Sequence, residues 1–456
     1  MTLNAENTTF SIAGRGLKLD TAEDAQEFVD SILSQENLEK VILSGNTFGV
    51  EAAQAIAKAL EQKKTLKARK IFVFDASDIF TGRLREEIPH AVKALCNSLE
   101  DKQLVELNFS DNAFGPAGVE PMVDFLTNNR SLKILKLNNN GLGPSGGKLI
   151  AKALLRAAEK NAVEGRESSL TTIIAGRNRL ENGSSQVLAD AIAAHGTLTE
   201  IRIPQNGIRS EGIVALSKGL AACKNLQVLD LQDNTFTESG SRAFAKALVE
   251  WPKLKLLNIG DCLLSADGGV IIAETLLLGH NKDLEHLNLQ YNEINSKGVS
   301  ILASAVSSHL KNLEFLELNG NCVNPEDVNS QEVHVEREIQ DSVIEIKSQE
   351  IKIQEEDHGI QKTVVEVNQE IHESVREKDK SMLKDTADAG QPSIPAGQTS
   401  LKDVANDNNI REAIPEVKLQ EVDREIHEGD RGISENTTAN EQVEALTERV
   451  SRCHYL

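Results

Sequence analysis

The side chains best suited to act on another molecule stand one position ahead of a recurring asparagine. Copies of L-x-x-L-x-L-x-x-N end at Asn46, Asn112, Asn140, Asn178, Asn206, Asn234, Asn292 and Asn321. We expect these asparagines to turn inward, where an amide can bond backbone groups left unpaired at a strand end. Neighbouring side chains on an extended chain point in opposite directions, so the preceding residues should face solvent along a rim. The six candidates are Asp111, Asn139, Arg177, Gln205, Asp233 and Asp261.

The rim residues favour recognition of a partner over chemistry on a small substrate. An amide such as that of Asn139 can donate and accept hydrogen bonds, and charged neighbours can form ion pairs. The sequence has no phosphate-binding glycine loop, no H-E-x-x-H, no G-x-S-x-G and no dinucleotide fingerprint. The ten histidines are dispersed. For His195, His280 and His309, near predicted helix ends, we expect surface or capping roles. We therefore expect no metal, no cofactor and an interaction protein.

Composition and charge exclude several classes of protein. No run of 18 apolar residues occurs, and the first residues lack an apolar stretch, so neither a membrane span nor a signal peptide is expected. Five scattered cysteines without a C-x-x-C pair indicate a reducing compartment rather than disulfides or zinc. A net charge of −21 without a basic patch argues against nucleic-acid binding. We expect a soluble, monomeric intracellular protein.

The leucine pattern predicts the scaffold that positions the rim. Copies begin at residues 38, 104, 132, 170, 198, 226, 254, 284 and 313. The interval from 38 to 104 leaves room for one irregular copy, and FSIAGRGLKLD at the front resembles a capping strand. Residues 1–324 therefore predict a leucine-rich-repeat solenoid of about eleven repeats, a ribonuclease-inhibitor-like α/β horseshoe. Short parallel strands (Leu229 and Leu231 alternate) would line its concave face, and helices (Phe244, Ala247 and Leu248 have helical spacing) its convex face.

Two segments break this rhythm, and the last third of the chain departs from it. Residues 158–169 (AEKNAVEGRESS) favour a polar loop that extends a helix end, and residues 66–89 form the second irregularity. Residues 325–456 carry 31 acidic and 15 basic side chains, so most of the net charge lies there. Their low apolar content predicts an acidic, mostly disordered tail. The final Cys453 to Leu456 has prenylation spacing without aliphatic residues, and we do not expect that modification.

Several segments beyond the leucines resemble Ran GTPase-activating proteins of the leucine-rich-repeat type. They occur in the family's order across residues 10–324, and generic repeats would not share TGR or NNGLGP. One departure is KARKIFVFDA ahead of Ser77, which is longer than the family pattern. The most specific segments are SDIFTGRLREEIP (77–89), FSDNAFGP (109–116), NNNGLGP (138–144), GRNRLENG (176–183) and VLDLQDNTFT (228–237).

The resemblance implies a GTPase-activating protein for Ran in its GTP-bound form, with or without a Ran-binding protein. Hydrolysis would occur in Ran's own active site, so the chain would activate in trans and would not itself be an enzyme. It would work in the cytoplasm, including the perinuclear region, and maintain the Ran gradient that directs nucleocytoplasmic transport. Asn139 would contact Ran's catalytic glutamine and orient it toward the attacking water. Arg85, Arg179 and Asp233, with the other rim residues, would be contacts to Ran.

Arg83, in the TGR sequence, has two interpretations. An arginine finger is worth about 10³–10⁵ in rate, whereas an arginine that holds an irregular loop through a salt bridge would act on structure. The resemblance implies support of the interface outside the phosphate site. Two other functions stay open. One is a non-catalytic interaction scaffold, although five cysteines and the single Trp251 fit a ribonuclease-inhibitor type poorly. The other is a Ran binder that does not activate.

Overall fold

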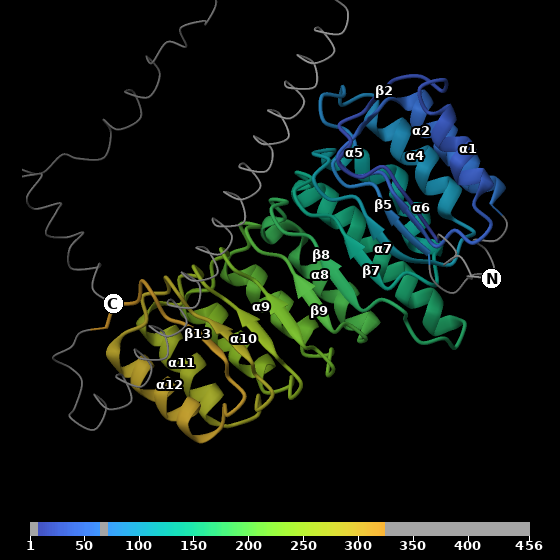
Figure 1. Ribbon diagram of the computed structural model, residues 1–456. Coiled ribbons are helices and arrows are strands. Elements are labelled where there is room, and N and C mark those ends of the chain that lie inside the picture. The colour runs from blue at the N-terminus through green and yellow to red at the C-terminus, as the bar shows by residue number, and fades with distance from the viewer. Residues whose placement is uncertain (1–7, 64–71, 324–456) are drawn as a thin grey trace, which may run out of the picture. The chain divides into compact units, whose positions relative to one another are not determined.

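Successive repeats place one short strand beside the next in a parallel sheet (Figure 1). The computed structural model describes residues 8–63 and 72–323. Eleven strands pair there in sequence order, which confirms the predicted solenoid and its repeat number. The strands are β1 (Thr9–Ser11), β3 (Lys40–Ile42), β5 (Phe72–Asp75), β6 (Leu104–Asn108), β7 (Ile134–Lys136), β8 (Thr172–Ile174), β9 (Glu200–Arg202), β10 (Val228–Asp230), β11 (Leu256–Asn258), β12 (His286–Asn288) and β13 (Phe315–Glu317).

Helices return the chain along one face of this sheet (Figure 1). Packed helices lie about 8–10 Å apart, while paired strands lie about 4.8 Å apart. The stack of repeats therefore has to curve with the strands on its inner side. The helices are α1 (Gln26–Ser34), α2 (Val50–Gln62), α4 (Ile88–Leu99), α5 (Gly115–Val119), the 3-10 turn η1 (Glu120–Met122), α6 (Val123–Asn128), α7 (Gly143–Val163), α8 (Glu181–His195), α9 (Ser210–Leu220), α10 (Thr237–Leu248), α11 (Ser265–Leu277) and α12 (Ser296–Ser308).

The core is a column of aliphatic layers between sheet and helices. Leu229 and Leu231 are buried from the strand side, and Phe244, Ala247 and Leu248 are buried from the helix side, as their spacing predicts. Each buried aliphatic side chain contributes about 1.5–3 kcal/mol, so a repeat is stabilised by burying its apolar faces against its neighbours. From β9 to β11 the middle residue of each strand pairs with the middle residue of the next, whereas the register shifts between Phe72 and Val73 where β5 pairs with β6.

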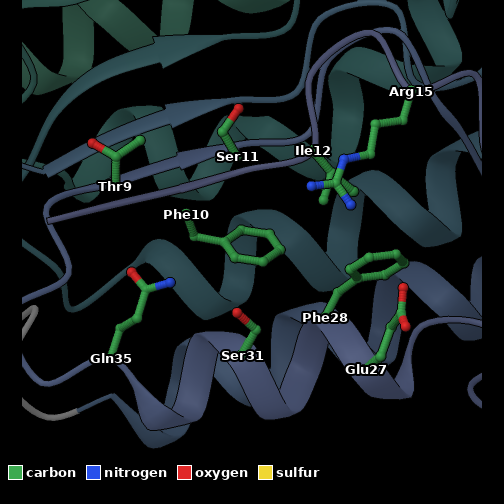
Figure 2. A pocket seen from close by; sticks show the side chains of 9 residues that line it. All are labelled: Thr9, Phe10, Ser11, Ile12, Arg15, Glu27, Phe28, Ser31 and Gln35. Carbon is green, nitrogen blue, oxygen red and sulfur yellow. The ribbon is translucent and has the colours of Figure 1, made fainter. Parts of the chain in front are cut away.

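The N-terminal end of the stack confirms the predicted capping strand. The strand β1 pairs in parallel with β3, and a second small sheet joins β2 (Lys18–Leu19) to β4 (Thr47–Phe48). Between β1 and α1, in the first repeat, lies a cavity of about 330 Å³ (Figure 2). Its wall includes the rings of Phe10 and Phe28, whose centroids are 6.4 Å apart.

The structure corrects three expectations about irregular positions. Residues 158–163 continue α7 instead of forming a loop, so the insertion lengthens the helix and only residues 164–169 lie outside it. FVFD within KARKIFVFDA is the strand β5 of the irregular copy and therefore belongs to the regular sheet. His195 is not at the surface, because it is only 8% exposed and its Nδ1 lies 2.6 Å from the Ser168 hydroxyl.

Several predictions fall outside the part of the chain that is described. These are the acidic tail at 325–456 with its terminal cysteine, and the start of the stretch ahead of Ser77. Within residues 8–63 and 72–323, no helix combines the length and apolarity needed to cross a bilayer.

Candidate functional site

The recurring asparagines form a buried column just beyond the carboxyl ends of the strands. Seven of the eight are at most 4% exposed, and Asn321 in the last repeat is half-buried. Asn206 shows the pattern, because its Nδ2 donates to Ala175 O at 3.0 Å and to Ile203 O at 2.9 Å. Its Oδ1 accepts the Asn178 N–H at 3.0 Å. Each amide therefore joins its own repeat to its neighbours and fixes the backbone at the strand end.

Apart from the capping repeat at β1, two repeats lack an asparagine in this column. Cys262 takes the position once, with its Sγ 3.4 Å from Leu231 O and 3.3 Å from Gly260 O. Ile79 takes it in the irregular copy, where its N–H is accepted by Asn112 Oδ1 at 2.8 Å. The sequence pattern did not identify Ile79 as a column position, because only the pairing of Asp75 with Asn108 aligns it with Asn112.

From the irregular copy to the repeat of β12, the residue ahead of each column position is exposed, but for a different reason from the one the sequence suggested. Asn139 has φ 53°, Gln205 φ 52° and Asp233 φ 54°, which is the left-handed region and not an extended strand. The backbone turns outward at this point and donates its N–H to a carbonyl of the next repeat. Examples are Asn139 N–H to Gly176 O at 2.9 Å and Gln205 N–H to Gln232 O at 2.8 Å. We call these exposed residues the rim row; its members are Asp78, Asp111, Asn139, Arg177, Gln205, Asp233, Asp261 and Tyr291.

The rim row contains all six residues nominated from the sequence and two that were missed. Tyr291, 58% exposed, directly precedes Asn292, so the same register argument could have found it. Asp78 precedes Ile79, so no asparagine of the repeat pattern follows it in the sequence. With strands about 4.8 Å apart, the six positions from Asp111 to Asp261 extend over about 24 Å. Such a row is long enough to meet a protein surface, not merely a small molecule.

Asn139 is held on several sides by its own repeat and its neighbours. Its backbone is fixed by the buried Asn140, which donates to Leu137 O at 3.1 Å, and by Asn138, whose Oδ1 accepts the Gly176 N–H at 2.6 Å. Its exposed side chain reaches the preceding rim residue, because Nδ2 donates to Asp111 Oδ1 at 3.1 Å. The amide is therefore presented to solvent on a fixed backbone.

Arg83 is committed to bonds within the chain. Its guanidinium pairs with Asp20 and donates to Thr47 Oγ1, Thr47 O and Leu19 O, each of the last three at 3.1 Å. The Arg83 side chain is only 10% exposed. The same contact holds the pKa of the Asp20 carboxyl below its usual value, with a further contribution from Lys18. These contacts favour the loop-holding interpretation over a finger.

The other two arginines nominated as contacts are accessible. Arg85 is exposed, one residue after Leu84, which is 65% exposed. Arg179 is exposed with φ 54°, two residues after Arg177 of the rim row. The structure thus leaves Arg85 and Arg179 on the surface while Arg83 is enclosed.

Charges on the exposed face of the strands neutralise one another. Lys136 Nζ lies 2.6 Å from Glu106 Oε1, and Arg202 Nε lies 2.6 Å from Glu200 Oε1. Beside Arg202, burial raises the pKa of Asp230. The rim row itself has four carboxylates against Arg177 and the nearby Arg179. A partner lying along it would meet a mildly acidic edge.

Metal ligands and thiols are the next candidates for reactive groups among the described residues. No group of three histidine, cysteine or acidic side chains within 8–63 and 72–323 could hold a metal ion. Burial raises the pKa of the Cys96 thiol to about 12, that of Cys223 to about 11 and that of Cys262 to about 12, so none of these is a ready thiolate nucleophile. The arrangement suits presentation of polar groups to another protein.

Comparison with known proteins agrees with the repeats and also finds similar proteins with a more specific name. A family model described as "Leucine Rich repeat" matches residues 103–123, 128–151, 222–245 and 280–303. Ran GTPase-activating protein 1 of Xenopus laevis is 46% identical over 209 residues, which is 45% of this chain and 35% of that protein.

Two further relatives carry related names. Ran GTPase-activating protein 2 of Caenorhabditis elegans is 42% identical over 45% of this chain and 21% of its own length. Ran GTPase-activating protein 1 of Saccharomyces cerevisiae is 37% identical over 45% of this chain and 51% of its own. The chain therefore spans about half or less of the length of these relatives.

Proposed function

Because this chain belongs to the leucine-rich-repeat family of Ran GTPase-activating proteins, we propose that it accelerates GTP hydrolysis on Ran. The observation that carries the proposal is Asn139: an exposed amide, held on a backbone that the buried asparagine column fixes. A rigidly presented amide can orient a partner's side chain, and orientation alone can account for large rate effects.

In the proposed mechanism, hydrolysis takes place in the active site of Ran, with Ran's own nucleotide and magnesium. Asn139 contacts Ran's catalytic glutamine and holds it against the attacking water. The chain acts in trans on the GTP-bound form, as a monomer, with or without a Ran-binding protein beside it. In the cytoplasm, including its perinuclear part, this activity keeps Ran·GTP low and maintains the gradient for nuclear transport.

The remaining rim residues act as contacts to Ran in this proposal. Asp111, Asp233 and Asp261 supply negative charge, and an acidic edge suits a basic partner surface. Exposed charges of this kind influence the rate of encounter and its salt dependence more than affinity. The other proposed contacts are Arg85, Arg177, Arg179 and Gln205, while Arg83 supports the surface from within.

A single-turnover assay of Ran·GTP hydrolysis, with this chain substoichiometric to Ran, tests the proposal. Wild-type chain should accelerate hydrolysis, and Asn139→Ala should lose about 10²-fold or more of that acceleration while staying folded. A matched control is Asn225→Ala, an exposed asparagine in the loop before β10 that lies outside the rim row and bonds Lys253.

The alternatives give different results in the same experiment. Binding of Ran·GTP without acceleration would identify a Ran binder that does not activate. Failure to bind Ran in either nucleotide state would leave an interaction scaffold for another partner.

A further inference from the structure

The contact between Asn139 and Asp111 determines which end of the Asn139 amide faces outward. The two residues occupy the same rim position in adjacent repeats, with φ 53° and 62°. A carboxylate can only accept hydrogen bonds, and Asp111 Oδ1 lies 3.1 Å from Asn139 Nδ2. The donor end of the amide is therefore turned along the rim toward Asp111. The carbonyl Oδ1 is left as the end available to a partner.

We propose that Asp111 is a positioning residue, which fixes the Asn139 amide so that its Oδ1, and not its Nδ2, meets the partner. This inference rests on the proposed function and deepens it. It makes Asn139 a hydrogen-bond acceptor, so the group it recognises on Ran must be a donor. In this inference Asp111 acts through Asn139, which replaces the direct contact to Ran proposed for it above.

The polarity of this contact matters to the hydrolysis step. The water oxygen forms a bond to the γ-phosphorus while the bond from that phosphorus to the β–γ bridging oxygen breaks, which yields GDP, inorganic phosphate and a proton. The water must direct a lone pair at phosphorus, so an acceptor has to hold its hydrogen. A glutamine side chain has one acceptor, Oε1, and one donor, Nε2.

Only one arrangement uses both ends of that glutamine productively. If its Oε1 accepts from the water, its Nε2 is left to donate to Asn139 Oδ1. A reversed Asn139 would set Nδ2 against Nε2, two donors facing each other, or would turn the glutamine and withdraw its acceptor from the water. Asp111 favours the productive arrangement before Ran arrives, because the exposed amide would otherwise rotate between two orientations of similar energy.

Two simpler roles for Asp111 predict different behaviour. As a direct charged contact, it would contribute to affinity, and its removal would weaken binding in a salt-dependent way. As a residue that merely tolerates the left-handed backbone, it would be replaced without loss by glycine. A positioning role predicts that binding survives and turnover does not, and that glycine fails as alanine does.

The test is a double-mutant cycle on residues 111 and 139, with single-turnover rate at saturating chain and affinity for Ran·GTP measured separately. Asp111→Ala and Asp111→Gly should lower the rate about 2- to 10-fold, the effect of losing one orienting hydrogen bond. Affinity should change by less than about 2-fold. Asp111→Asn should restore the rate, because its Oδ1 can still accept from Asn139. In an Asn139→Ala background, Asp111→Ala should have no further effect on the rate.

Several outcomes would overturn the inference. These are a rate unchanged in Asp111→Ala, a loss confined to affinity, a full additional loss in the Asn139→Ala background, or an Asp111→Asn variant as slow as Asp111→Ala. Asp190→Ala, which removes an exposed carboxylate on α8 away from the rim row, controls for loss of one negative charge. If wild-type chain fails to accelerate hydrolysis, the proposed function is wrong. If Asn139→Ala abolishes acceleration and Asp111→Ala does not reduce it, this inference alone is wrong.

Discussion

Replacing Arg83 by alanine separates a supporting arginine from an arginine finger. The substitution removes the donors to Leu19 O, Thr47 O and Thr47 Oγ1 and the ion pair with Asp20. Hydrogen bonds from a charged donor are worth about 1.5–3 kcal/mol each. Because the acceptors share one side chain and some can be rehydrated, their losses do not add, and we expect a total near 3 kcal/mol.

Equilibrium urea unfolding, followed by far-ultraviolet circular dichroism, measures this loss directly. The midpoint should fall without a change in slope, since the surface exposed on unfolding is almost unaltered. Asp20→Ala should shift the midpoint in the same direction by less, because it removes one partner of the same guanidinium and lies outside the rim row. In the hydrolysis assay at saturating chain, folded Arg83→Ala should stay within about 10-fold of wild type, far from the loss expected for a finger.

Two results together would contradict a supporting role for Arg83. A free energy of unfolding equal to that of wild type, together with a rate loss of about 10³ or more, would mean that Arg83 leaves its internal partners and enters the phosphate site. Asp20→Ala would then be neutral or would increase activity, since it frees the arginine.

Three further predictions concern stability. Asn206→Ala should lower the free energy of unfolding by about 2–4 kcal/mol, because it leaves the buried Asn178 N–H without its acceptor; a loss no larger than that of Asn225→Ala in the same urea titration would contradict it. Burial lowers the pKa of His195 to about 4, so this histidine stays neutral in the folded state while it is protonated below about pH 6.5 in the unfolded chain. The free energy of unfolding should therefore fall as the pH drops from 6.5 toward 4, by about 2 kcal/mol at pH 5. His195→Gln should flatten that pH profile. Gly219→Ala should destabilise by about 1–3 kcal/mol despite better helix propensity, because a Cβ there would lie 2.4 Å from Ala189 O; a raised thermal midpoint would disprove this.

The scaffold could be predicted because its signal is repeated and local. Leu229 and Leu231 on one strand, and Phe244, Ala247 and Leu248 on the following helix, each satisfy a short-range periodicity that recurs along the chain. The asparagine column followed from the same register. The prediction missed the column position of the irregular copy, because Ile79 does not match the asparagine of the repeat pattern.

The finer features of the site depend on contacts that spacing does not contain. The partners of Arg83 lie 36 and more residues away in sequence, so its enclosure could not be seen from TGR. The outward turn at Asn139 arises from hydrogen bonds between repeats. The sequence pattern suggested an extended backbone there, which predicted the exposure of the side chain correctly and the backbone conformation wrongly. The insertion after residue 157 extended α7 because Ala158 and Asn161 find a buried face there, which polarity alone did not suggest.

The left-handed backbone of the rim row has a cost in stability. A non-glycine residue in the left-handed region is strained by about 1–3 kcal/mol, less for asparagine and aspartate. Gly45 and Gly320, at the same position near the two ends of the stack, adopt φ 68° and 73° without that strain. Between them the chain keeps Arg177, Gln205 and Tyr291, which β-carbon sterics disfavour there. Glycine at these positions would relieve the strain but would also remove the side chains, so under the proposed function the strain is the cost in stability of the surface that meets Ran.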